Sequence, residues 1–78
     1  MANMILVVNA QLRSLVERRK GVGLSQYRLA VRAEVSKFRL AMYELGQCEL
    51  SSEELGRIDR AISEQAQRIW EGYGSSSS

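Results

Sequence analysis

The segment from Ser25 to Gly46, SQYRLAVRAEVSKFRLAMYELG, restricts the possible fold more than any other part of this chain. Ser25 and Ser36 are both favourable N-cap residues, because each hydroxyl can accept a hydrogen bond from an amide of the first helical turn. The caps stand eleven residues apart, which leaves room for one short helix and a turn of about three or four residues. The segment therefore predicts two short helices joined by a tight turn.

Apolar residues after each cap are spaced to form one face of a short helix. The residues expected to face inward are Leu29, Ala30 and Ala33 in the first helix, and Leu40 and Tyr43 in the second. The side chains left for the outer surface of the second helix are Lys37, Phe38, Arg39 and Met42. The pattern predicts a second helix with one face in the core and another facing outward.

This pattern resembles the helix-turn-helix of the Cro and lambda-repressor group, often called Xre-like regulators. The matching residues are Leu24, Ser25, Gln26, Leu29, Ala30, Val35, Ser36, Leu40, Glu44 and Gly46, together with Leu12, Arg13, Leu55 and Ile58 outside the motif. The resemblance implies an all-α fold, a small four- to five-helix lambda-repressor-like helix-turn-helix domain. One position departs from it, since Glu34 stands where such turns usually carry glycine. A non-glycine residue at positive φ costs about 1 kcal/mol, so the turn is either mildly strained or differently shaped.

Composition narrows the function classes. The chain has 78 residues, no proline, no histidine and one cysteine, Cys48. Without histidine it cannot build a histidine-based catalytic triad, and one cysteine cannot form an internal disulfide or a cysteine–histidine metal cluster. We therefore expect no enzyme activity, no cofactor and no metal site. The lone thiol suits a reducing cytoplasm, and so short a chain would gain stability from forming a homodimer.

Charge is distributed unevenly along the chain. Residues 10–43 carry eight basic and two acidic side chains, a net charge of +6, whereas residues 44–78 carry three basic and seven acidic ones, a net charge of −4. Such asymmetry fits one face turned to a polyanion, although charges also simply coat solvated helices. The basic set coincides with the two-helix segment, which favours the polyanion interpretation.

An apolar run, residues 4–8, lies near the N-terminus. It is far shorter than the roughly 20 residues that cross a membrane, and it lacks the flanking features of a signal peptide. It fits either the first turns of a helix or a short strand that ends before a cap at Asn9. We expect the run to be buried against a partner subunit. Residues 1–8 would then form a dimer arm with Ile5 and Val7 in the interface.

Two further helices are expected around the central pair. The first covers about residues 9–20 and is stopped by the glycines of residues 21–23. Its basic end, residues 18–20, can stabilise the helix dipole or bind phosphate. The last helix begins at a capping box of Ser51 and Glu54 and continues to residue 72. Its second half exceeds what a small core needs and would reach a partner.

The domain organisation follows from these elements. Residues 9–72 would form the helix-turn-helix DNA-binding domain, and residues 73–78 a disordered Gly/Ser tail. The dimer contacts expected from the last helix are Ile69 and Trp70.

The resemblance implies a sequence-specific DNA-binding regulator, a homodimeric repressor that binds double-stranded DNA at a near-palindromic operator. The helix that starts at Ser36 would enter the major groove. The family's base-facing positions correspond to Lys37, Phe38 and Met42: the lysine can donate to guanine, and the other two can pack on thymine methyl groups. Arg39 can contact either guanine or a phosphate. The alternatives are a displaced core aromatic for Phe38 and a core gap-filler for Met42.

Other residues would position the DNA backbone. The expected contacts are Gln26, Arg28, Arg32 and Ser36. The family counterpart of Gln26 bonds a phosphate, and helix N-termini favour anions. Glu44 is expected to form an ion pair inside the domain, with an arginine of the first helix. The alternative function is an antitoxin or other protein-interaction module with a DNA-binding fold, whose apolar ends hold a protein partner such as a toxin.

Overall fold

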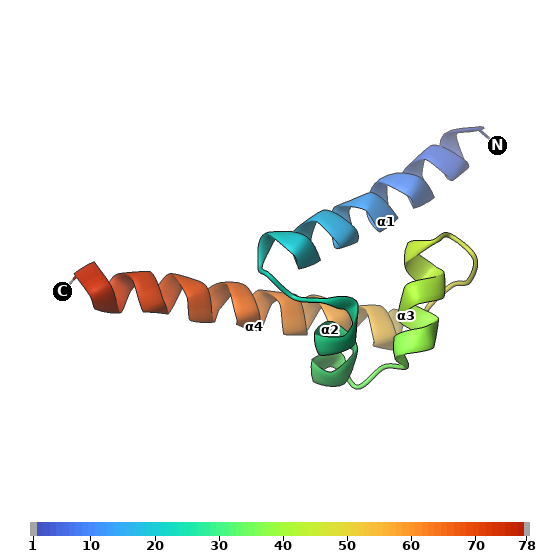
Figure 1. Ribbon diagram of the computed structural model, residues 1–78. Coiled ribbons are helices and arrows are strands. Elements are labelled where there is room, and N and C mark those ends of the chain that lie inside the picture. Colours follow the sequence, from blue (N-terminus) through green and yellow to red (C-terminus); the bar gives the residue numbers. More distant parts are fainter. Residues whose placement is uncertain (1, 78) are drawn as a thin grey trace.

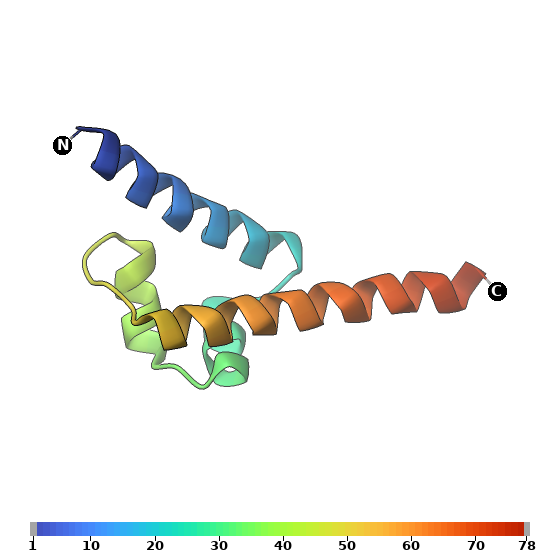
Figure 2. The ribbon, with the colours of Figure 1, turned by 180° about the vertical axis from the view of Figure 1, so that it is seen from behind.

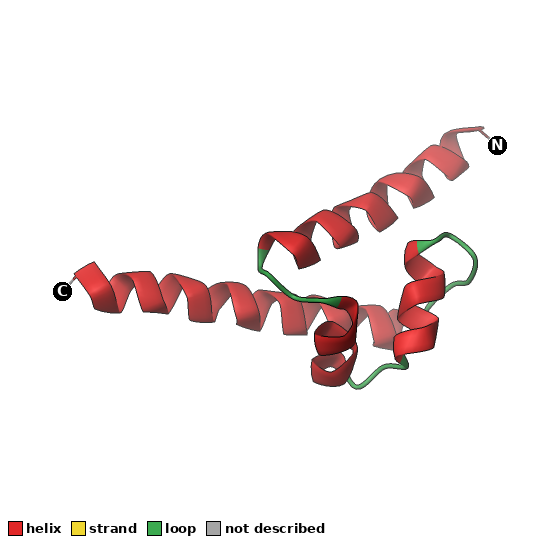
Figure 3. Cartoon of the chain, viewed as in Figure 1, coloured by secondary structure: helices red, strands yellow, loops and turns green. Residues whose placement is uncertain are grey.

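The computed structural model describes the backbone of residues 2–77 and the side chains of residues 11–72. This part of the chain contains four helices and no strand: α1 (Ala2–Gly21), α2 (Gln26–Ala33), α3 (Lys37–Glu44) and α4 (Ser52–Ser77). Short loops join them (Figure 3). The predicted all-α fold is confirmed. The free ends of α1 and α4 project from opposite sides of the helical core (Figures 1 and 2).

The core lies where α2 and α3 pack against the first half of α4. Leu29, Leu40 and Ile58 contribute one fully buried side chain from each of these helices. The other buried apolar residues are Leu15, Leu24, Ala30, Ala33, Leu50, Ala61 and Ile62. Tyr43 is half-buried against this cluster. The inward faces predicted for the two short helices are therefore confirmed.

Each helix after α1 begins at a predicted serine cap. The Ser25 hydroxyl accepts from the amide of Arg28 at 3.1 Å, and the Ser36 hydroxyl accepts from the amide of Arg39 at 3.3 Å. The capping box at the start of α4 is also present. The Ser51 hydroxyl accepts from the Glu54 amide at 3.1 Å, and the Glu54 carboxylate accepts from the Ser51 amide at 2.9 Å.

Helix α1 is longer at its N-terminus than the predicted helix over residues 9–20. The apolar run of residues 4–8 is helical, so the strand alternative is wrong. Extension of a helix adds one hydrogen bond per residue without a new nucleation cost, and the first glycine of α1 is Gly21, at its end. The side chains of Ile5 and Val7, which we expect in a dimer interface, lie outside the described residues.

Helix α4 also exceeds its predicted end. It continues past residue 72 through Ser77, so helical backbone replaces the tail predicted to be disordered, and residue 78 lies outside the described residues. A glycine inside a helix costs only about 1 kcal/mol, which the preceding turns can offset. The second half of α4 leaves the core, where Ile69 is 40% and Trp70 77% exposed. Among the described residues, no helix has the length and apolarity that a membrane crossing requires.

Candidate nucleic-acid interface

The turn between α2 and α3 depends on a strained residue. Glu34 has φ 57° and ψ 45°, the left-handed region that normally favours glycine. Its amide donates to the carbonyl of Val31 at 3.3 Å, and the amide of Val35 donates to the carbonyl of Ala30 at 3.0 Å. These bonds close the C-terminus of α2. Of the two alternatives for this turn, the mildly strained one is confirmed.

Arg57 of α4 holds this turn from outside. Its Nε donates to the carbonyl of Ala33 at 3.1 Å, and its Nη2 donates to the carbonyl of Glu34 at 3.3 Å. Its Nη1 donates to the Glu53 carboxylate at 3.0 Å. The guanidinium therefore satisfies carbonyls that the end of α2 leaves without helical partners. Sequence reasoning missed this role, and the only hint is the Glu53–Arg57 spacing of four residues.

A buried polar network joins α1, α2 and α3. Arg19 Nε and Nη2 donate to the two carboxylate oxygens of Glu44 at 2.8 and 2.9 Å. Arg19 Nη1 donates to the carbonyl of Leu24, and the Gln26 amide donates to Glu44 Oε1, both at 2.9 Å. The expected partner of Glu44, an arginine of the first helix, is confirmed. Gln26, predicted to bond a phosphate, uses its side-chain amide inside the protein.

The outer face of α3 is mainly apolar. Phe38 is 72% exposed on the side of the helix opposite the buried Leu40, so its interpretation as a displaced core aromatic is wrong. Leu45, the C-cap of α3, is 69% exposed. Met42 is half-buried and Lys37 is exposed. The predicted base-facing residues Lys37, Phe38 and Met42 thus lie on the part of α3 that does not enter the core.

Two of the predicted DNA contacts instead bind α4. Arg39 Nη2 donates to the Glu54 carboxylate at 2.7 Å and to the carbonyl of Glu49 at 3.4 Å. The guanidinium of Arg32 donates to the side-chain oxygen of Gln65. The exposed Arg28 and Lys37 have no side-chain partner among the residues whose side chains are described. Those two cations therefore remain available to an external anion.

The capping box at α4 is electrostatically tuned. The Ser51 backbone amide holds the pKa of Glu54 below its ordinary value of 4.5, and the Ser51 hydroxyl and the Arg39 guanidinium act in the same direction. These effects outweigh desolvation, which alone would raise that pKa. In the core, burial raises the pKa of Tyr43. The Glu54 carboxylate is thus a stable anchor for Arg39.

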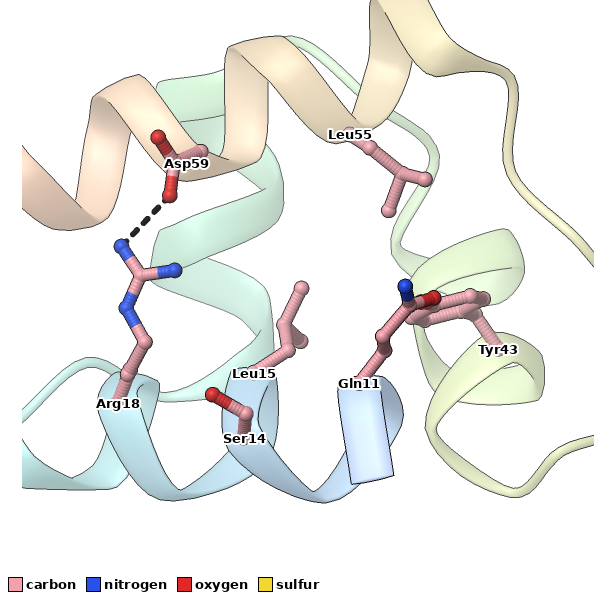
Figure 4. Close-up of a pocket in the computed structure, with 7 residues that line it drawn as sticks. All are labelled: Gln11, Ser14, Leu15, Arg18, Tyr43, Leu55 and Asp59. Atoms are coloured by element: carbon pink, nitrogen blue, oxygen red, sulfur yellow. Dashed lines mark ion pairs between the residues drawn. The ribbon is translucent and has the colours of Figure 1, made fainter. Parts of the chain in front are cut away.

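An open groove of about 520 Å³ lies between α1, α3 and α4. In Figure 4, Leu15 and Leu55 point into it from facing helices. At one end, Arg18 Nη2 and Asp59 Oδ1 form a 2.6 Å ion pair. The groove lies on the α1 side of α4 and does not include the outer face of α3.

Comparison with known protein families, with curated proteins and with solved structures finds no significant match for this chain. The site is therefore interpreted from its own geometry.

Proposed function

We propose that the protein is a sequence-specific DNA-binding transcriptional regulator of the helix-turn-helix type, a homodimeric repressor of a near-palindromic operator. The observation that carries this proposal is the presentation of α3. Leu40 anchors one face of the helix in the core, while Phe38 and Lys37 project from the rest of its surface. A helix exposed in this way has the shape that major-groove recognition requires.

The rigidity of α3 supports the same proposal. Its N-terminus is capped by Ser36, and its C-terminal Glu44 is held by Arg19 and Gln26. Base recognition depends on side chains held at fixed positions relative to the groove. A helix secured at both ends meets that requirement.

The charge around α3 also fits a polyanion. Between residues 26 and 45 the exposed charged side chains are those of Arg28, Arg32, Lys37 and Arg39, against the single carboxylate of Glu34. Arg39 and Arg32 already contact α4. We therefore assign phosphate contacts first to Arg28, with Lys37 shared between phosphate and guanine.

Dimerisation accounts for the apolar surface left on α4. Ile69 and Trp70 lie beyond the last buried residue of that helix, Ile62. The free ends of α1 and α4 project from opposite sides of one chain, so they can meet only between two copies (Figure 1). A twofold dimer would set two α3 helices about 34 Å apart, on successive major grooves.

Selection of bound sequences from random DNA tests the proposal, followed by titration of the selected duplex and of an unrelated one. We expect Phe38→Ala to weaken binding of the selected duplex by about 1–3 kcal/mol and to leave the unrelated duplex nearly unchanged. Arg28→Ala is the matched control, since loss of a phosphate contact weakens both duplexes alike. If no sequence is enriched, or if Phe38→Ala weakens both duplexes equally, the proposal is wrong.

A second candidate is an antitoxin or similar protein-binding module. The observation in its favour is the exposed Trp70 on the half of α4 that leaves the core, since tryptophan is often a binding hot spot. Sedimentation distinguishes the two candidates. A chain that stays monomeric at high micromolar concentration would favour a heterologous partner on α4 over a second copy.

A further inference from the structure

An apolar strip runs along the outer face of α3. Its members are Phe38, Ala41, Met42 and Leu45, which are spaced at three- and four-residue intervals and so lie on one side of the helix. Phe38 and Leu45, at the two ends of the strip, expose most of their surface. Leu45 was not among the side chains that the sequence suggested for this face.

Polar side chains of α3 are directed away from this strip. Arg39 is bound to Glu54 and to the carbonyl of Glu49 on the side of α4. Glu44 is buried with Arg19. Of the charged and polar side chains within α3, Lys37 at its first turn is the one left beside the strip. The outer face of α3 therefore offers few hydrogen bonds and a large apolar contact surface.

Base edges in the major groove differ in what they offer to such a surface. Guanine, adenine and cytosine present hydrogen-bonding atoms, and thymine alone adds a methyl group. An apolar side chain cannot replace the hydrogen bonds of the other bases, but it can bury a methyl group. Exposed cations around the strip, Arg28 and Lys37, match a polyanion better than an apolar protein surface.

We infer that α3 recognises a pattern of 5-methyl groups on the operator, with Phe38 and Leu45 as the specificity-determining residues. This inference rests on the proposed DNA binding and names what the helix recognises there. Phe38 and Leu45 contact methyl groups at separate positions of each half-site, and Lys37 donates to a neighbouring guanine.

The test is to replace single thymines of the selected operator by deoxyuridine. Uracil keeps every hydrogen-bonding atom of thymine and lacks only the methyl group. We expect about a fourfold loss of affinity for each contacted methyl, which corresponds to about 0.8 kcal/mol. The reverse change uses operators with cytosine at a contacted position. There 5-methylcytosine should bind more tightly than cytosine.

Variants assign each methyl group to a side chain. In Phe38→Ala, deoxyuridine should cease to matter at one position of each half-site, and in Leu45→Ala at a different one. Both residues are exposed, so the fold should survive, and circular dichroism checks this. Arg28→Ala is the control: it should weaken binding to every duplex and leave the sensitivity to deoxyuridine unchanged.

Three other outcomes would overturn the inference. If no DNA sequence is preferred, the proposed function fails and this inference fails with it. If a preferred operator tolerates deoxyuridine at every position, DNA binding stands and methyl recognition is wrong. If deoxyuridine weakens binding equally in wild type and in both alanine variants, the methyl groups act through DNA shape and not through α3. A loss of self-association in Phe38→Ala, with deoxyuridine sensitivity unchanged, would identify the strip as a protein interface.

Discussion

Arg19 and Glu44 form a buried two-point ion pair that ties the end of α1 to the end of α3. Their side chains are only 9% and 6% exposed. Both partners have further hydrogen bonds, from Arg19 to the Leu24 carbonyl and from Gln26 to Glu44. A buried pair of this kind adds little stability over an apolar pair, but loss of one partner leaves an uncompensated buried charge. Its geometry orients α3 relative to the rest of the domain.

Arg19→Ala should therefore destabilise the domain strongly. We expect a loss of about 3–5 kcal/mol in the free energy of unfolding, measured by urea denaturation, because Glu44 stays buried without its partner. Arg18→Ala removes an ion pair that is exposed on both sides, and should cost no more than about 1 kcal/mol. Equal effects of the two changes would show that the Arg19 pair carries no special role.

Glu34→Gly should stabilise the protein. Glycine adopts the left-handed conformation of residue 34 without strain, and the gain should exceed the added entropy of the unfolded chain by about 0.5–1 kcal/mol. Glu34→Ala keeps the β-carbon and removes the carboxylate, so it should give no such gain. Thermal and urea denaturation of both variants decide. Stabilisation by alanine equal to that by glycine would mean that charge, and not backbone strain, limits the turn.

Stability should fall in acid partly through Glu54. Its pKa is lowered in the folded state by the Ser51 amide first, so its contribution to stability is present above about pH 4.5 and disappears as pH falls through the folded-state pKa. Wild type should exceed Glu54→Gln in stability at pH 7, and the difference should shrink towards pH 3. Urea denaturation across this range measures it. A difference that stays constant with pH would contradict the assigned role of the carboxylate.

The dependence of DNA affinity on salt should separate the two arginines near α3. Arg28 is exposed without a partner among the described side chains, so Arg28→Ala should reduce the slope of log affinity against log salt by about 0.9. Arg39 is already paired with Glu54, so Arg39→Ala should change that slope less. Fluorescence anisotropy at several salt concentrations gives both values. The reverse order would identify Arg39 as the phosphate contact.

Trp70→Ala should shift the protein towards monomer and weaken operator binding cooperatively. Trp70 exposes most of its surface on the half of α4 that leaves the core, and a buried tryptophan commonly dominates an interface. Sedimentation of wild type and variant measures the change. Gln67→Ala, on the same exposed half of α4, is the control and should remain dimeric. If Trp70→Ala dimerises as wild type does, the dimer forms elsewhere.

Features that depend on local chemistry could be predicted from the sequence. The caps at Ser25 and Ser36, the inward face around Leu29 and Leu40, and the strained turn at Glu34 follow from neighbouring residues. The ion pair of Glu44 followed from the family resemblance and from the poor fit of a carboxylate to DNA.

Features that depend on docking between distant elements could not be predicted. Arg32 and Arg39 look like free cations in the sequence, but in the structure α4 brings Gln65 and Glu54 beside them. The bonds of Arg57 to the turn likewise require α4 to be in place. Helix ends were missed for another reason: residues 4–8 and 73–77 extend existing helices, where propagation outweighs weak local preferences.

The contacts of Arg57 make the α2–α3 unit dependent on a helix that follows it in the chain. The turn reaches its final conformation only when α4 docks and the guanidinium bridges Ala33 and Glu34. An excised peptide of residues 24–46 would lack that brace as well as the ion pair to Arg19. The two short helices are therefore not a portable cassette: grafted into another protein, they would need a counterpart of α4 to keep their mutual angle.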